Sequence, residues 1–196
     1  MLLYYRKTEV NRMELLHKIE YRLLKEEELT PGLLADFERD QEVTRVWSPV
    51  DGKLTLIENP FREEWTEKQK DELVVTYFPN AIHSGGCVVA ALDKGTVIAF
   101  AVLEGGLFGK GKQYIQLASI HVSLAFRGMG IGRHLFSLIS GEARKRGAEK
   151  LYISSHYAEE TQAFYKAVGC VPAKETFDGL ASCEPNDIPL EFLLNP

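Results

Sequence analysis

The hydrophobic positions of the chain recur with two periods, and each period predicts one kind of secondary structure. Apolar or alternating runs predict strands over residues 19–24, 88–92, 96–104, 113–122, 151–154, 170–174 and 190–194. A hairpin is predicted over 43–57, with Asp51-Gly52 as its turn. Strands alternating with helices in this way indicate an α/β protein with a mixed sheet.

Apolar residues spaced three and four positions apart predict helices over 64–78, 133–146 and 159–168. Gly147 and Gly169 are expected to end the last two helices as left-handed caps. Thr30 as an N-cap and Pro31 at the first helical position predict another helix over 30–39.

Two prolines are expected to interrupt the predicted elements. Pro60, with Asn59 before it, should break the chain after the hairpin, and Pro79 should end the helix over 64–78. Residues 1–18 are polar and mixed, and they precede the first clear strand. We therefore expect an N-terminal arm over 1–18 and a single domain over 19–196.

A glycine-rich turn, R-G-M-G-I-G over residues 127–132, leads from the predicted strand over 113–122 into the helix over 133–146. Such a turn leaves backbone N–H groups pointing outward at the start of a helix, where the helix dipole adds positive charge. Glycines let a ligand approach the backbone closely. Arg127 and Arg133 flank the turn and carry charge suited to phosphate oxygens. The turn therefore predicts a phosphate-binding site.

Two common phosphate-binding patterns do not fit this turn. The P-loop requires Lys and then Ser or Thr after its last glycine, whereas Arg133 and His134 follow here. The dinucleotide pattern G-x-G-x-x-G fails because the third glycine comes one residue early.

The spacing R-x-x-G-x-G instead resembles the turn of the GCN5-related N-acetyltransferases, which holds the pyrophosphate of acetyl-CoA. A second segment, F-Y-K-A-V-G-C over 164–170, is similar to the family's aromatic-Tyr-x-x-x-Gly-Phe signature. The order of predicted elements over 19–194 also resembles that of the family. The resemblance implies a central, mostly antiparallel sheet with splayed middle strands, flanked by helices.

The resemblance also assigns roles to individual residues, with acetyl-CoA as co-substrate and no metal. The cofactor-binding residues it implies are Ile120, Val122, Arg127, Gly128, Gly130, Gly132 and Arg133. Ile120 and Val122 would pair through their backbone with the pantetheine amides, as an added strand would. Two positions depart from the family pattern, since Ala158 replaces a frequent asparagine and Cys170 replaces an aromatic residue.

The catalytic residues are less well defined. The resemblance implies that Tyr165 protonates the departing CoA thiolate, which suits a phenol with a pKa of about 10. Packing as an ordinary core aromatic is the alternative for Tyr165. His121, Glu104 or water would accept the proton that the attacking amine loses. The resemblance thus predicts an N-acetyltransferase acting on a small-molecule or peptide amine.

Composition bears on which partners, metal sites and compartments are expected for this chain. The formal net charge is 23 − 28 = −5, which argues against nucleic acid and is compatible with a cationic amine. The three cysteines lack metal or disulfide spacing, and Cys87 and Cys170 are expected to be buried thiols. No apolar run reaches the roughly 20 residues of a membrane span. We expect a cytoplasmic protein without a membrane or nucleic-acid partner, and we leave a homodimer open.

Two alternatives to an enzyme of this kind stay open. One is a non-catalytic acyl-CoA-binding or sensing module that keeps the turn without turnover. The other is a Rossmann-type nucleotide-binding protein, which the glycine spacing and the antiparallel strands predicted before the turn disfavour.

Overall fold

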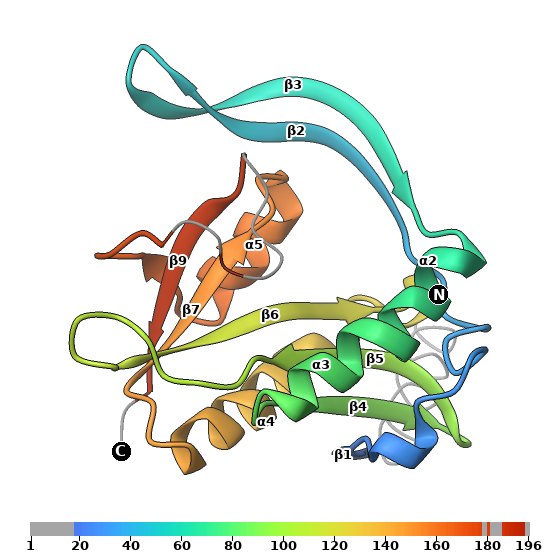
Figure 1. Cartoon of the computed structure of the whole chain (residues 1–196). Helices are drawn as coiled ribbons and strands as arrows, with labels where there is room; N and C mark the ends of the chain where they lie inside the picture. The colour runs from blue at the N-terminus through green and yellow to red at the C-terminus, as the bar shows by residue number, and fades with distance from the viewer. Residues whose placement is uncertain (1–17, 178–179, 181–185, 195–196) are drawn as a thin grey trace, which may run out of the picture.

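The computed structural model describes residues 18–177, 180 and 186–194, so Cys183 and most of the predicted N-terminal arm lie outside the described residues (Figure 1). The strands are β1 (Glu20–Leu23), β2 (Asp40–Val50), β3 (Lys53–Glu64), β4 (Cys87–Asp93), β5 (Thr96–Leu103), β6 (Tyr114–Val122), β7 (Lys150–Ser155), β8 (Val171–Pro172) and β9 (Ile188–Leu193). The α-helices are α2 (Glu67–Glu72), α3 (Phe78–His83), α4 (Ile131–Lys145) and α5 (Glu159–Ala167). A π-helical turn (Leu73–Tyr77) joins α2 to α3.

Within the described residues, the main sheet has the strand order β1-β4-β5-β6-β7-β9-β8. Neighbouring strands are antiparallel except for β6 and β7, which are parallel. A mostly antiparallel sheet with helices on its faces confirms the fold class predicted from the sequence.

Strands β6 and β7 pair only at their first residues and then separate. The three pairs are Tyr114 with Lys150, Ile115 with Leu151 and Gln116 with Tyr152. Beyond them β6 continues to Val122 along β5, while β7 turns toward β9 (Figure 1). The splay of the middle strands is thereby confirmed.

Helices cover both faces of the sheet. On one face α4 packs its apolar side, including Leu135, Ile139 and Ala143, against the sheet. On the other face Phe37 and Phe78 pack around Phe100 of β5. Both layers are built from the apolar spacing seen in the sequence, because burying these stripes is the main stabilising contribution.

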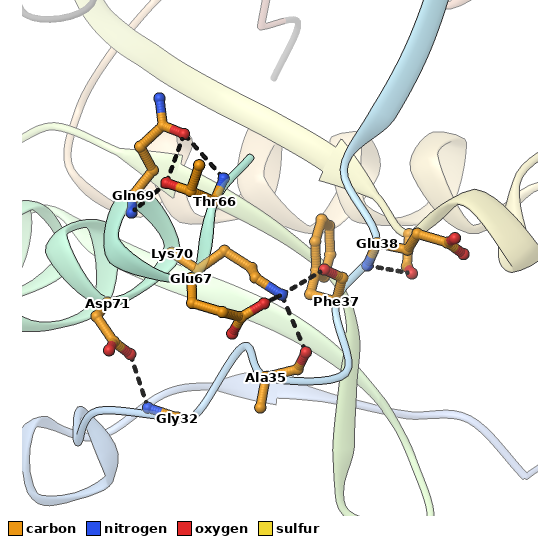
Figure 2. Close-up of polar contacts among 10 residues, drawn as sticks. Gly32, Ala35, Phe37, Glu38, Thr66, Glu67, Gln69, Lys70 and Asp71 are labelled. Atoms are coloured by element: carbon orange, nitrogen blue, oxygen red, sulfur yellow. Dashed lines mark hydrogen bonds and ion pairs between the residues drawn. The ribbon is translucent and has the colours of Figure 1, made fainter. Parts of the chain in front are cut away.

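The predicted helix over 30–39 is wrong, and turns occupy this segment instead. Lys70 of α2 is buried, and its amino group donates to the carbonyl oxygens of Ala35 (3.0 Å) and Phe37 (3.2 Å). Gly32 has φ = +86° and donates its N–H to Asp71 at 2.8 Å. These tertiary contacts, shown in Figure 2, take backbone groups that the segment would use to form a helix.

The two prolines expected to break elements lie inside them. In the hairpin, Val43 pairs with Phe61 and Arg45 with Glu58, so Pro60 falls at a bulge, where no ladder hydrogen bond is needed. Pro79 is the second residue of α3, which directly follows the π-helical turn, so the helical segment continues through this proline with an altered hydrogen-bond pattern before it.

The hairpin turn at Asp51-Gly52 is confirmed, with φ values of +48° and +76°. The hairpin itself, β2–β3, is longer than predicted and arches over the sheet toward α5 (Figure 1). Its β2 strand meets the residues before α5, because Trp47 donates its N–H to the Tyr157 carbonyl (2.9 Å) and Val46 bridges to Ala158. The hairpin therefore spans the side on which β6 and β7 separate.

Candidate active site

Beyond Gln116, the residues of β6 have no strand partner among the described residues on the side of β7, which leaves a gap between the two strands. The N–H of Ser123 donates to the Ile98 carbonyl of β5 at 2.9 Å. Successive residues of an antiparallel strand direct their backbone groups to opposite sides, so those of Ile120 and Val122 point away from β5. The gap thus offers a strand edge to which an extended ligand with amide groups can add.

The glycine-rich turn follows this strand end directly. Gly128 and Gly130 have φ values of +73° and +88°, and a Cβ at either position would meet no atom within 4 Å. Gly130 is the N-cap of α4, and its carbonyl accepts the first helical hydrogen bond, from His134 at 3.1 Å. The N–H groups of the intervening residues have no intrahelical acceptor, which favours an anion at this open surface.

Gly132 has a different role from the two glycines before it. A Cβ there would lie 3.3 Å from the Phe164 ring and 3.5 Å from Val122 Cγ2. The absence of a side chain therefore lets the start of α4 pack closely against both the end of β6 and α5. This packing holds the glycine-rich turn beside the end of β6, where β6 and β7 have separated.

The two arginines that flank the turn are held by backbone carbonyls. Arg127 donates from Nε to the Val122 oxygen (3.0 Å) and from Nη1 to the Asp40 oxygen (2.6 Å). Arg133 donates from Nη1 to the Ala167 oxygen at 3.1 Å. Direct contact of either guanidinium with phosphate stays a prediction.

Tyr165 lies on α5 and is only 6% exposed. Its ring packs against Phe164, with 5.2 Å between centroids, and belongs to the core cluster beneath α4. Burial, with smaller contributions from Cys170 and Asp187, raises the pKa of the Tyr165 hydroxyl well above its ordinary value. The hydroxyl therefore stays protonated at neutral pH but is a weaker acid than an ordinary phenol. Its packing in the core is observed, and its role as a proton donor stays a prediction.

His121 faces the opposite side of β6 from the side chains of Ile120 and Val122, which pack against the α4 core. Its ring lies 4.7 Å from the Trp65 ring and 5.4 Å from the Phe100 ring. Burial, followed by the charges of Arg39 and Arg127, lowers the pKa of His121 to about 3. A histidine with so low a pKa is neutral and a weak base.

Glu104, the other candidate base, lies at the far end of the sheet. Its N–H donates to the Gln116 carbonyl at 3.0 Å, whereas Val122 pairs with Ala99. Six residues of strand separate Gln116 from Val122, or about 20 Å. Glu104 is therefore out of reach of chemistry at the end of β6.

A polar cluster that the sequence analysis missed lies where the base of the hairpin meets the residues before α5. Glu63 contacts Arg39 Nη2 at 2.9 Å and His156 Nε2 at 3.2 Å. His156 Nδ1 accepts the N–H of Ala158 at 3.2 Å, so Nε2 carries the proton toward Glu63. The His156 hydrogen bond, the largest of several contributions, lowers the pKa of Glu63, and the carboxylate is ionised at neutral pH.

Trp65 borders a groove of about 350 Å³ beside this cluster. The groove follows one side of the helical segment and is lined by Trp65, Gln69, Glu72, Leu73, Thr76, Tyr77 and Asn80. Its lining combines apolar and polar side chains with one carboxylate, that of Glu72, and such a mixture suits a small organic ligand. Trp65 thus contributes both to the core around Phe100 and to an open surface.

No metal centre is formed by the described residues, which contain no group of three or more metal-ligating side chains. Cys87 and Cys170 are buried and unpaired, and burial raises their thiol pKa values to about 11 and about 12. Within the same residues, no helix has the length and hydropathy needed to cross a membrane.

The acetyltransferase (GNAT) family model matches residues 53–170, a stretch that includes the glycine-rich turn and both splayed strands. No curated protein sequence matches the chain significantly.

Solved structures show the same fold at low sequence identity. Nourseothricin acetyltransferase is 18% identical, with a TM-score of 0.65 over 91% of this chain and 99% of its own. A candidate streptothricin acetyltransferase from Bacillus anthracis strain Ames, in complex with acetyl coenzyme A, is 17% identical, with a TM-score of 0.60 over 88% and 95%. The Escherichia coli ribosomal-protein-S18-alanine N-acetyltransferase is 19% identical, with a TM-score of 0.55 over 91% and 95%.

Proposed function

The chain belongs to the acetyltransferase (GNAT) family, and from this membership we propose that it transfers an acetyl group from acetyl-CoA to a primary amine. The observation that supports this most is the backbone edge of β6. Ile120 and Val122 direct their peptide groups into the gap beside β7, and the strand ends at the glycine-rich turn. We also propose that residues 19–196 form one domain, since the sheet takes strands from both ends of this range.

The described residues fit acetyl-CoA in two places. The open surface at Gly128 and Gly130, with the first N–H groups of α4, would hold the pyrophosphate. The peptide groups of Ile120 and Val122 would hold the pantetheine amides as an added strand. Arg127 and Arg133 would add positive charge beside the turn.

The acetyl group would then lie near Val122, with the amine approaching from the hairpin side for direct attack in a ternary complex. A backbone N–H of the strand near Val122 would donate to the thioester oxygen as negative charge develops there. The Tyr165 hydroxyl would donate a proton to the departing CoA thiolate, which requires that the bound cofactor lower the raised pKa of this phenol. Water would accept the proton lost by the amine, and His121 would instead shape the acceptor side, because its lowered pKa makes it a weak base.

Structural neighbours indicate how widely acceptors vary on this fold. Their names include acetyltransferases of nourseothricin, of streptothricin and of a ribosomal protein's alanine. The fold alone therefore does not select the acceptor, and the residues around Trp65 and Glu63 would do so in this chain.

The direct test is release of free CoA thiol from acetyl-CoA in the presence of a panel of primary amines. We expect thiol release that depends on one class of amine, with the acetylated amine identified by mass spectrometry. Acetyl-CoA binding without thiol release for any amine would favour the non-catalytic binding module. Binding of NAD in place of CoA would favour a nucleotide-binding protein.

A further inference from the structure

Arg39 precedes β2 and carries a guanidinium with unmet hydrogen bonds. Its side chain is 9% exposed, and one nitrogen, Nη2, pairs with Glu63 at 2.9 Å. The other two nitrogens, Nε and Nη1, are buried and have no hydrogen-bond partner among the described residues. Leaving a donor buried and unpaired destabilises the fold, so such groups are normally satisfied by a ligand or by water.

The position of this guanidinium points to the acceptor side of the candidate active site. It lies 5.7 Å from the centre of the Trp65 ring, and the Trp65 ring lies 4.7 Å from the His121 ring. The charge of Arg39 is close enough to help lower the pKa of His121, which immediately precedes Val122. Arg39 is therefore near the strand end where the acetyl group would lie.

Glu63 contacts the Arg39 guanidinium at one nitrogen only. Burial, the largest contribution, and the neighbouring Arg127 both lower the pKa of Arg39, whereas Glu63 and Asp40 raise it. Of these two carboxylates, Glu63 is shared with His156, and Asp40 is held in a two-bond contact by Arg62 at 2.7 Å. The contacts among the described residues thus leave Nε and Nη1 of Arg39 for a further acceptor.

We propose that Arg39 binds a carboxylate of the acceptor, so that the acceptor is an amino acid or a similar small amine with a carboxylate close to the reacting nitrogen. This inference rests on the proposed acetyltransferase function and names the acceptor class. Glu63 would keep Nη2, while the remaining N–H groups of Arg39 would meet the acceptor carboxylate.

Access to Arg39 requires the base of the hairpin to move, because its free nitrogens are enclosed. The hairpin is held to α5 by Arg45 and Glu159, whose side chains are 51% and 32% exposed. The hairpin also contacts the residues before α5 through the Trp47 N–H to the Tyr157 carbonyl and through the buried Val46 and Ala158, so access to Arg39 requires a local rearrangement at Arg39 and Glu63 and not the release of the whole hairpin.

The test compares amino acids with their carboxamides, which keep the amine and remove the charge. The pairs are alanine, leucine, phenylalanine and lysine, each with its amide, assayed as acceptors for wild type, Arg39→Gln and Arg39→Lys. Arg22→Gln is the matched control, because Arg22 lies on β1, away from the gap, and likewise pairs with a glutamate, Glu28. Comparing each variant with wild type cancels the difference in basicity between acid and amide.

We expect wild type to acetylate at least one free acid, with Arg39→Gln lowering kcat/KM for that acid by about tenfold to a hundredfold. The amide should change less than threefold, the KM for acetyl-CoA should hold, and Arg39→Lys should retain part of the activity. Equal losses for acid and amide would overturn the proposal. A rise confined to the acetyl-CoA KM would overturn it too, since the anion would then be a CoA phosphate.

Two further outcomes keep the proposal separate from the proposed function and from misfolding. If Arg39→Gln does not fold, acetylation of amides or simple amines by wild type, with none of the acids, overturns the carboxylate site. If no amine releases thiol, the transferase function fails. Calorimetric titration of the four amino acids into CoA-saturated protein then decides the site, and absence of heat with all four overturns it.

Discussion

The guanidinium of Arg127 donates from Nε to the carbonyl oxygen of Val122, 3.0 Å away. Its Nη1 also donates to the Asp40 carbonyl, at 2.6 Å. One side chain therefore joins the end of β6, the glycine-rich turn and the start of the hairpin. We infer that Arg127 sets the position of the strand end, whether or not it also contacts phosphate.

Replacing Arg127 by alanine should weaken binding of both acetyl-CoA and acetyl-pantetheine, which lacks the pyrophosphate. Losing a charge-assisted hydrogen bond costs about 1.5–3 kcal/mol, or roughly tenfold to a hundredfold in affinity. Calorimetric titration of both ligands measures the effect. A loss confined to acetyl-CoA would show that Arg127 acts chiefly as the phosphate ligand that the sequence predicted.

Tyr165→Phe tests the proposed proton donor, because it keeps the buried ring and removes only the hydroxyl. If Tyr165 protonates the thiolate, kcat should fall by roughly 10²–10⁴-fold while the affinity for acetyl-CoA holds. Steady-state thiol release provides the measurement, with Tyr21→Phe on β1 as a control. A decrease of less than about threefold, with chemistry rate-limiting, would leave Tyr165 as a packing residue.

Gly132→Leu should destabilise the fold and weaken acetyl-CoA binding together. Even a Cβ here lies 3.3 Å from Phe164 and 3.5 Å from Val122, so a leucine would force α4 away from β6. We expect about 1–3 kcal/mol of lost stability in urea unfolding. The control is Gly141→Leu on the same helix, where a Cβ meets no atom within 4 Å. Equal losses of stability and acetyl-CoA affinity in both variants would contradict a packing role for Gly132.

A buried network where β6 and β7 still pair should make stability depend on pH. Glu191 accepts from the Tyr114 hydroxyl (2.5 Å), Lys150 (3.0 Å) and the Lys174 N–H (3.2 Å). Burial alone would raise the pKa of Glu191, but these donors outweigh it and lower the pKa below its ordinary value. The folded protein therefore keeps the carboxylate charged to lower pH than the unfolded chain does.

The difference in the pKa of Glu191 between the folded and unfolded protein determines how stability changes with pH. A carboxyl with a lowered folded pKa stabilises the fold above its unfolded pKa of about 4.3, and this stability is lost as pH falls through the folded pKa. Glu191→Gln should cost about 1–3 kcal/mol at neutral pH and less as the solution is acidified. Urea unfolding over that range measures it, with exposed Glu27→Gln as control. A cost that does not change with pH would contradict this account.

Elements with strong local signals were predictable from the sequence. The strand β6, the turn at Gly128 and Gly130, and the helix α4 follow one another within about thirty residues, and each has its own periodicity or backbone requirement. The segment over 30–39 was not predictable in this way. Its carbonyls are captured by Lys70, more than thirty residues away, so tertiary contacts override the helix signals at Thr30 and Pro31.

One side of the candidate site was predictable from the sequence and the other was not. The cofactor side depends on backbone geometry, which glycine spacing reveals, whereas the acceptor side depends on side chains that meet only after folding. Arg39 and Glu63 are 24 residues apart, and Glu63 meets His156 from a different part of the chain. Neither spacing nor periodicity relates these three residues, because nothing local requires them to be neighbours.

The cofactor site at the glycine-rich turn is the central claim, and Gly130→Glu changes it at its most open point. Gly130 has φ = +88°, and a glutamate there would place negative charge where the pyrophosphate should lie. Gly147→Glu is the matched control, because Gly147 has φ = +80° and similarly open surroundings at the other end of α4. Both variants carry a similar backbone strain of about 1–2 kcal/mol.

Calorimetric titration of acetyl-CoA into wild type and these two variants is the most direct measurement. We predict binding to wild type and to Gly147→Glu, and loss of binding to Gly130→Glu while circular dichroism shows a retained fold. Unchanged acetyl-CoA affinity in a folded Gly130→Glu protein would contradict the site, and with it the mechanism proposed here.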